Sequence, residues 1–460
     1  MNRDSDLWLD DDTIAALSTP AGIGGLGVVR VSGLRALDVV RACVADLSWN
    51  PRPRRAGLVE LVAAGNSLDR SLVTFFPGPR SYTGEDVVEI SLHGSPILAD
   101  RLLDALCTAG ARRALPGEFT LRAFRSGRID LIQAEAVNSL INARSEEGAR
   151  LAFSSMEGAL SDKMNRLRSR MIELGAALET EIEFAEDQHM DAIPALEAVR
   201  SARDEIGVIL EQARFNEVLR RGLEVVIAGR VNAGKSTLFN SLLANDRALV
   251  SSRPGTTRDF LTGTIYIDGF PVDLTDVAGW DNLSRDDLES RGIRRGVERL
   301  AEGDVVLLLM DASRPLNDAD EEMDRMTAGY DRLVVATKMD RSDPDVLEQL
   351  RRRYADEPYC EVSALEVPAL PDIRNFLRNR VRNLTRREND FAVSARQREL
   401  LRELRDRLGR ICEGLESGNP EVELLAEELR RGLDCVGRLT GGITTGDILT
   451  EVFSRFCIGK

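Results

Sequence analysis

The glycine-rich segment at residues 229–236, GRVNAGKS, constrains the fold of this chain more than any other feature. A buried-strand pattern, LEVVIA, precedes it at residues 223–228, and a helical pattern, TLFNSLL, begins at residue 237. A strand, a loop of the form G-x-x-x-x-G-K-S/T and a helix in this order are typical of a phosphate-binding loop. Strand and helix patterns alternate over residues 217–383, which predicts an α/β domain with a mostly parallel sheet.

The residue types in this loop suit phosphate chemistry. Gly229 and Gly234 allow backbone N–H groups to surround phosphate oxygens at the start of a helix. We expect Lys235 to act catalytically on the β- and γ-phosphates and Ser236 Oγ to ligate Mg2+. The nucleotide contacts expected from this loop are Asn232, Ala233, Gly234, Lys235, Ser236 and Thr237.

Later segments follow in the order that a guanine-nucleotide hydrolase needs. In the segment SSRPGTT, Thr257 can ligate Mg2+ beside the γ-phosphate, and Asp276 supplies a carboxylate at the end of a strand pattern. Asp340, in the segment TKMD, can accept from guanine N1 and the amino group, and the backbone of Ser363 and Ala364 faces guanine O6. The expected contacts are Ser251, Ser252, Arg253, Pro254, Gly255, Thr256, Thr257, Asp276, Val277, Ala278, Gly279, Thr337, Lys338, Asp340, Ser363 and Ala364.

Three positions depart from the usual pattern of such sites. Thr337 stands where Asn is usual, so we expect no amide to reach guanine N7 or to tie the phosphate loop, and a lower guanine affinity. Val277 stands where Thr is usual. Trp280 occupies the place where some GTP-hydrolysing proteins carry a Gln that orders the attacking water.

The composition of the chain limits which other classes of protein it can belong to. The chain has 460 residues, a net charge of −15, six cysteines without a C-x-x-C pair and only two histidines, so a zinc cluster is not expected. The acidic balance disfavours a DNA-binding protein, and RNA contact would need a local patch or a partner's surface. The first residues are acidic, and the longest apolar run, residues 305–310, is far too short to span a membrane. These features predict a cytoplasmic protein without a membrane span.

The pattern divides the chain into four parts. Residues 1–126 show short strand-like runs with some helix, an α+β pattern. Residues 127–216 and 384–460 are helical on both sides of the α/β part at residues 217–383, which predicts a helical bundle with that part inserted into it. One long amphipathic helix is expected from the apolar spacing of Phe153, Met156, Leu160, Met164, Leu167, Met171, Leu174 and Leu178.

Segments outside the phosphate-binding part resemble the bacterial tRNA-modifying GTPase family called MnmE or TrmE. They are PAGIGGLGVVR at residues 20–30, SYTGEDVVE at 81–89, PGEFTLRAF at 116–124, DLIQAEA at 130–136, GTTRD at 255–259 and FCIGK at 456–460. The resemblance implies an N-terminal folate-binding and dimerising domain, a helical domain and an inserted GTPase domain. It implies a homodimer that assembles with a flavoprotein of the MnmG/GidA type, a heterotetramer, with FAD on the partner and tRNA bound through the complex.

The implied reaction places a (carboxymethyl)aminomethyl group on C5 of the wobble uridine of tRNA, with carbon from 5,10-methylene-tetrahydrofolate. GTP hydrolysis would drive a rearrangement of the GTPase domains. The resemblance also implies a K+ ion held by Asn232, Ser251, Arg253 and Thr256, and a water-positioning role for Glu289, whose alternative is a solvated helix carboxylate. A tetrahydrofolate derivative, in the 5-formyl or 5,10-methylene form, would be bound by Arg30, Glu89, Arg128 and Lys460.

Other interpretations remain open at this point. The GTPase part alone also fits a ribosome-assembly switch that binds RNA without modifying it, and the folate-like segments alone fit a one-carbon transferase. The run GIGGLG at residues 22–27 matches a dinucleotide fingerprint, but a strand pattern follows it, so no nicotinamide or flavin site is expected there.

Overall fold

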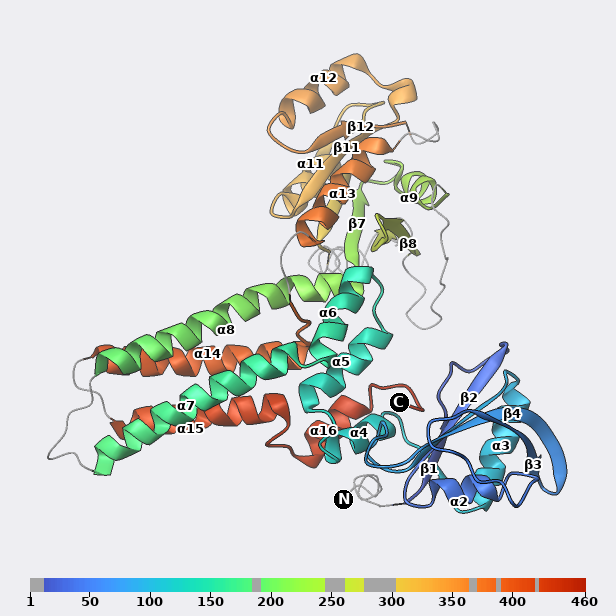
Figure 1. Cartoon of the computed structure of the whole chain (residues 1–460). Helices are drawn as coiled ribbons and strands as arrows, with labels where there is room; N and C mark the ends of the chain where they lie inside the picture. The colour runs from blue at the N-terminus through green and yellow to red at the C-terminus, as the bar shows by residue number, and fades with distance from the viewer. Residues whose placement is uncertain are drawn as a thin grey trace, which may run out of the picture. The chain divides into compact units, whose positions relative to one another are not determined.

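We analysed the chain as a computed structural model, which describes residues 12–183, 192–244, 261–276, 303–363, 370–385, 390–417 and 422–460 (Figure 1). Its residues form two compact units. The first comprises Met1–Asn138, Phe153–Gly207 and Ala395–Lys460, and the second comprises Ser139–Ala152 and Val208–Ser394. No helix in the described ranges is long and apolar enough to span a membrane.

The N-terminal part of the first unit is built on a six-stranded sheet in the order β3-β4-β5-β2-β1-β6. Neighbouring strands are antiparallel except β1 and β6. Alternate residues such as Val29 and Val31 pack with Leu102 and Leu106 of α3 in one core, because a strand points every second side chain to the same face. The elements are β1 (Ile14–Leu17), β2 (Leu26–Ser32), α2 (Ala36–Arg41), β3 (Gly57–Ala63), β4 (Asn66–Phe76), β5 (Val87–His93), α3 (Pro96–Thr108) and β6 (Arg112–Arg113).

Helices from two separate stretches of the chain, before residue 208 and after residue 394, pack together in the same unit. Helix α7 (Ala159–Glu183) packs on α15 (Val422–Thr440), which packs on α14 (Ala395–Glu416), and Arg200 of α8 (Ala192–Arg221) pairs with Glu416 of α14. Figure 1 shows these four helices running alongside one another. The leucines of α14 line the core, and Leu401, Leu404 and Leu408 are all buried. Shorter helices complete the unit: α4 (Glu118–Arg125), α5 (Leu131–Ile141) and α16 (Gly446–Phe453).

The single long helix expected from residue 153 onward is wrong. The structure has two helices, α6 (Glu146–Met156) and α7, separated at Gly158. Gly158 has a φ of 104°, a backbone conformation that glycine adopts without steric cost and that ends a helix. Phe153 is 51% exposed, so the buried stripe begins only at Leu160.

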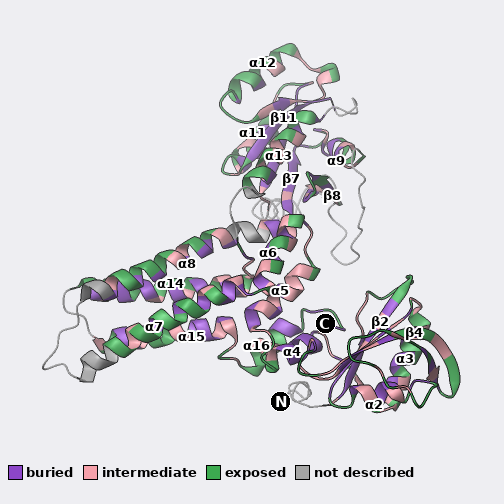
Figure 2. Cartoon of the chain, in the orientation of Figure 1, coloured by how far each residue is buried: buried purple, intermediate pink, exposed green. Residues whose placement is uncertain are grey.

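The second unit has a six-stranded sheet in the order β12-β11-β10-β7-β9-β8. All neighbouring pairs are parallel except the β8–β9 hairpin, whose turn lies between Ile267 and Phe270. Figure 2 shows the strand β11, next to the edge strand β12, as buried, and every residue of β10 is buried. The elements are β7 (Leu223–Gly229), α9 (Lys235–Ala244), β8 (Leu261–Ile267), β9 (Phe270–Asp276), β10 (Val305–Asp311), α11 (Asp318–Thr327), β11 (Arg332–Thr337), α12 (Pro344–Arg353), β12 (Tyr359–Glu361) and α13 (Pro371–Thr385), with the 3-10 helix η2 (Met339–Arg341).

The predicted fold class is confirmed: an α+β N-terminal domain, a helical bundle and an α/β domain with a mostly parallel sheet. The domain boundaries at residues 126, 216 and 383 remain a prediction.

Candidate nucleotide site

The loop at residues 229–236 connects the end of β7 to the start of α9. Gly229 has a φ of 149°, and a Cβ at this position would lie 2.7 Å from the carbonyl oxygen of Leu309, so no larger residue fits without a shift. Asn232 has a φ of 61°, a conformation that asparagine tolerates better than most residues. The turn therefore already has the sharp curvature of a phosphate-binding loop.

Lys235 is the first residue of α9 and is 5% exposed. Its Nζ donates hydrogen bonds to the carbonyl oxygens of Gly229 and Arg230, both at 2.9 Å. The ammonium thus lies across the loop, at the end of a helix whose N-terminal N–H groups favour an anion.

Ser236 and Asp276 meet at the sheet edge beside this loop. Ser236 Oγ donates a 2.8 Å hydrogen bond to Asp276 Oδ2. Asp276 is fully buried at the end of β9, and its Oδ1 has no hydrogen-bond partner within the described ranges. A buried carboxylate oxygen without a partner beside a hydroxyl is the oxygen donor set that a hydrated Mg2+ uses, so these two residues fit that ion.

Thr337 corrects one expectation from the sequence. Its hydroxyl donates a 2.7 Å hydrogen bond to the carbonyl oxygen of Ala233, so Thr337 does tie the phosphate loop, although it carries no amide. The bond is buried and joins the end of β11 to the loop between β7 and α9. A short hydroxyl suffices here because the two backbones lie close together at that point.

The residues expected to recognise guanine follow directly after Thr337. Lys338 Nζ pairs with Asp311 Oδ2 at 2.7 Å, and the hydroxyl of Ser363 lies 3.4 Å from Asp340 Oδ1. Asp340 lies on η2, and no residue of that short helix is buried. The structure thus brings the carboxylate of Asp340, Ser363 and the end of β11 to one edge of the sheet.

Most of the remaining predicted contacts lie outside the described residues. Thr237 is exposed on α9, whereas Ser251, Ser252, Arg253, Pro254, Gly255, Thr256, Thr257, Val277, Ala278, Gly279, Glu289 and Ala364 lie outside the described residues. Of the K+ ligands, only Asn232 is described, and it is exposed. The roles of these residues remain predictions.

Sequence reasoning missed two buried charges at the same edge. Asp311 ends β10 and is fully buried, and Arg230, the second residue of the phosphate loop, is 8% exposed. Their guanidinium nitrogen and carboxylate oxygen lie 3.6 Å apart. The sequence did contain a signal for Asp311, because it directly follows a fully apolar run. An aspartate in that place lies at the carboxyl edge of a parallel sheet, where such domains bind ligands.

Three of the four residues expected to bind folate lie close together in the first unit. Arg30 on β2 pairs with Glu89 on β5 at 2.8 Å, and its guanidinium lies over the ring of Tyr82. Arg30 also donates a 3.5 Å hydrogen bond to the carbonyl oxygen of Gly459, which brings the C-terminal residue, Lys460, close to this pair. Burial and the charge of Arg30 lower the pKa of Lys460. Arg128 is exposed, and the described contacts do not join it to the other three.

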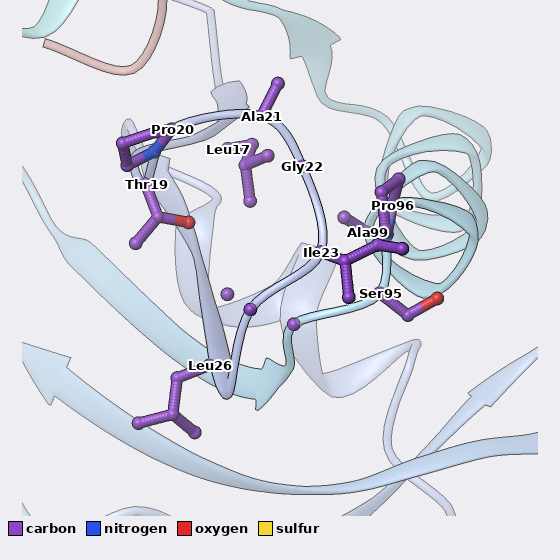
Figure 3. Close-up of a pocket in the computed structure, with 13 residues that line it drawn as sticks. Leu17, Thr19, Pro20, Ala21, Gly22, Ile23, Leu26, Ser95, Pro96 and Ala99 are labelled. Atoms are coloured by element: carbon purple, nitrogen blue, oxygen red, sulfur yellow. The ribbon is translucent and has the colours of Figure 1, made fainter. Parts of the chain in front are cut away.

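A pocket of about 300 Å3 opens in the same unit (Figure 3). It lies between the loop at residues 19–26 and the start of α3, and Leu17, Ile23, Leu26 and Pro96 line it. None of the four residues expected to bind folate belongs to its lining. As expected, the run GIGGLG leads into the strand β2, which begins at Leu26, and not into the helix that a dinucleotide-binding turn requires.

Comparison with known proteins identifies the family. The model of the MnmE helical domain matches residues 131–457, and that of the N-terminus of GTP-binding protein TrmE matches residues 13–128. The chain is 36% identical over 462 residues to the tRNA modification GTPase MnmE of Coxiella burnetii strain RSA 493, covering 98% of this chain and 99% of that one. It belongs to the MnmE family.

Other MnmE proteins agree with this assignment. The tRNA modification GTPase MnmE of Aquifex aeolicus is 36% identical over 456 residues, covering 98% of this chain and 100% of the relative. That of Alkalilimnicola ehrlichii is 40% identical over 453 residues, covering 97% and 99%. Membership of the MnmE family confirms the predicted enzyme class, a GTPase, and the family that the sequence motifs resemble.

Proposed function

We propose that this chain hydrolyses GTP to drive the modification of wobble uridine in tRNA. The observation that carries the proposal is the assembled phosphate site, in which Lys235 spans the loop and Ser236 meets the buried carboxylate of Asp276. The relatives of this chain over its whole length are named tRNA modification GTPases.

The described residues have different roles in GTP binding and hydrolysis. Lys235 releases its two carbonyl partners to neutralise charge on the β- and γ-phosphates. Mg2+, when held by Ser236 and by Asp276 directly or through water, supplies further positive charge to those phosphates. Asp340 selects guanine because a carboxylate can accept from both the N1–H and the amino group.

A second cation would bind on the exposed side of the loop. Asn232 is exposed and has a left-handed backbone conformation, and with Ser251, Arg253 and Thr256 it would hold K+. A monovalent cation there would stabilise the charge that develops between the β- and γ-phosphates, as an arginine finger does in other GTPases. Glu289 would orient the attacking water.

The first unit would bind the folate derivative that supplies the carbon. Arg30 and Lys460 are cations that suit the carboxylates of a tetrahydrofolate derivative, and Glu89 accepts from donor groups of the pterin ring. Arg128 would join them as a further cation. A flavoprotein partner of the MnmG/GidA type would complete the modification, and tRNA would bind to the complex of that partner with a dimer of this chain.

Nucleoside analysis of tRNA tests this proposal. A strain lacking the gene should lose 5-(carboxymethyl)aminomethyl groups from wobble uridine, and the wild-type gene should restore them. Lys235→Ala should fail to restore them, whereas Arg352→Ala should restore them fully because its side chain is 80% exposed on α12. Unchanged wobble uridine in the deletion strain, with accumulation of precursor rRNA, would instead favour the ribosome-assembly function.

A further inference from the structure

We propose that Asp311 is a positioning residue for guanine recognition, which holds the phosphate loop and the guanine loop, residues 337–340, in one arrangement. The inference deepens the proposed function, since it rests on this site binding a guanine nucleotide. Asp311 is fully buried, so its effect on the nucleotide is indirect. It acts through Lys338 on one side and through Arg230 on the other.

The carboxylate of Asp311 is shared among several groups. Its Oδ2 lies 2.7 Å from Lys338 Nζ, 3.1 Å from Arg314 Nε and 3.6 Å from Arg230. Its Oδ1 accepts from the backbone N–H of Ser313 at 3.0 Å and from the Ser313 hydroxyl at 2.7 Å. Because both oxygens are used and the side chain is fully buried, the carboxylate has little freedom to move.

On the guanine side, this ion pair acts on a strained residue. Lys338 has a φ of 61°, a left-handed conformation that costs a residue with a Cβ free energy and persists only when its surroundings impose it. The pair with Asp311 is a contact that can impose it, because it fixes the far end of the same side chain. Lys338 is two residues before Asp340, so the direction of the base-reading carboxylate follows from this conformation.

On the phosphate side, Asp311 acts through the second residue of the loop. Arg230 is held between Asp311 and Asp320, whose Oδ1 lies 3.2 Å from its Nε. The carbonyl oxygen of Arg230 is one of the two that receive Lys235 Nζ. Arg314 adds a second link, because its guanidinium also lies 3.4 Å from the carbonyl oxygen of Val231.

Asp320 provides a natural contrast. It also holds Arg230 and is buried, but its described contacts do not include the guanine loop. Its other oxygen accepts from the backbone N–H of Asn317 at the start of α11, a bond that an asparagine at 320 can keep. If base recognition depended only on a buried negative charge beside Arg230, replacing either carboxylate would have the same effect. A positioning role predicts instead that only the change at Asp311 alters base recognition.

The test compares GDP with inosine diphosphate on the purified full chain. The two ligands share every phosphate and ribose contact, and inosine lacks only the amino group that Asp340 accepts from. Asp311→Asn should raise the Kd for GDP about tenfold and reduce the preference for GDP over inosine diphosphate about threefold, because the lost charge frees Lys338. Asp320→Asn should leave that preference unchanged.

Steady-state kinetics give a second readout. Asp311→Asn should raise the KM for GTP and leave kcat within about twofold, since ground state and transition state lose the same base contact. The double variant with Asp311→Asn and Lys338→Met should have the same Kd for GDP as Lys338→Met alone. Both changes break the same ion pair, between Asp311 and Lys338. Should Asp311→Asn fail to fold, Ser313→Ala, which removes the 2.7 Å bond to Oδ1, should lower the same preference in the same direction.

Three results would overturn the inference: an unchanged preference in Asp311→Asn, an equal change in Asp320→Asn, or additive effects of Asp311→Asn and Lys338→Met. Failure of the wild-type chain to bind GDP at all would overturn the proposed function together with this inference.

Discussion

The hydroxyl of Thr337 and the carbonyl oxygen of Ala233 are joined by a buried hydrogen bond of 2.7 Å. This bond connects the strand that leads into the guanine loop with the loop that surrounds the phosphates. The sequence alone suggested that a threonine would leave these two loops unconnected. The two loops are tied at this point, so the substitution of threonine for the usual asparagine removes the amide but keeps the link.

We therefore predict that Thr337→Val weakens guanine-nucleotide binding. Valine has nearly the same shape, so the change removes the donor and leaves the carbonyl oxygen of Ala233 buried without it, at a cost of roughly 1–2 kcal/mol. The Kd for GDP, measured by titration calorimetry, should rise about tenfold. Thr337→Ser keeps the hydroxyl and serves as the control, and equal affinities for the valine and wild-type chains would contradict this interpretation.

A second prediction concerns Arg144 and Asp273 within the second unit. The guanidinium of Arg144 binds both oxygens of Asp273 on β9, at 2.6 and 2.9 Å, and also donates to the carbonyl oxygen of Arg221 at the end of α8. Arg144→Lys keeps the charge but loses the two-pronged geometry. It should lower the stability of this unit by about 1 kcal/mol, and Arg144→Ala by about 2 kcal/mol.

The measurement is thermal unfolding, following the transition that shifts when GDP is added. Arg150→Ala is the matched control, because Arg150 is 53% exposed and pairs with Glu147 within one helix turn. Such exposed pairs contribute about 0.5 kcal/mol or less. Equal effects of the two alanine variants would show that the Arg144 pair is no stronger than a surface ion pair.

The sequence predicted strands β7 and β10 of the second unit well, because each contains an apolar run. Every residue of β10 is buried, and such a run has few alternatives in an α/β domain. The helix break at Gly158 was missed because the apolar spacing of three and four continues across it. A single glycine within a periodic pattern does not by itself reveal its backbone φ.

The phosphate loop could be predicted because its chemistry depends on local spacing. The network around Asp311 could not, because it joins Arg230, Asp311, Arg314 and Lys338 from different parts of the chain, and charges of this kind usually lie in water. The link from Thr337 to Ala233 was missed for the same reason: the distance between two loops 104 residues apart is a property of the fold.

Acid should weaken the contribution of Asp311. Burial alone would raise the pKa of this carboxyl, but hydrogen bonds from Lys338 and Ser313 outweigh it and lower the pKa to about 2. The value in an unfolded chain is about 3.9, so this group stabilises the fold above about pH 4 and loses that effect as the pH falls toward 2. The difference in Tm between the wild-type chain and Asp311→Asn should therefore shrink from about pH 5 to pH 3. A constant difference would contradict the assignment.

The cysteines should differ in how fast they react with a thiol reagent. Cys457 is exposed, whereas burial raises the pKa of Cys43 to about 11 and that of Cys360 to about 12. Since the thiolate is the reactive form, iodoacetamide at about pH 8 should label Cys457 first. Cys43 and Cys360 should react only after denaturant is added, as followed by peptide mass spectrometry. Labelling of all three at one rate in the folded protein would be inconsistent with the burial described.

The most direct test of the central claim is GTP hydrolysis by the purified chain in KCl and in NaCl at equal ionic strength, with ATP as the control. A phosphate site completed by Asn232 and a K+ ion, with Asp340 selecting guanine, predicts stimulation by K+ on the order of 10–100-fold that is restricted to GTP. Asn232→Ala should remove the stimulation. Equal and slow rates in both salts, or equal hydrolysis of ATP, would contradict the account.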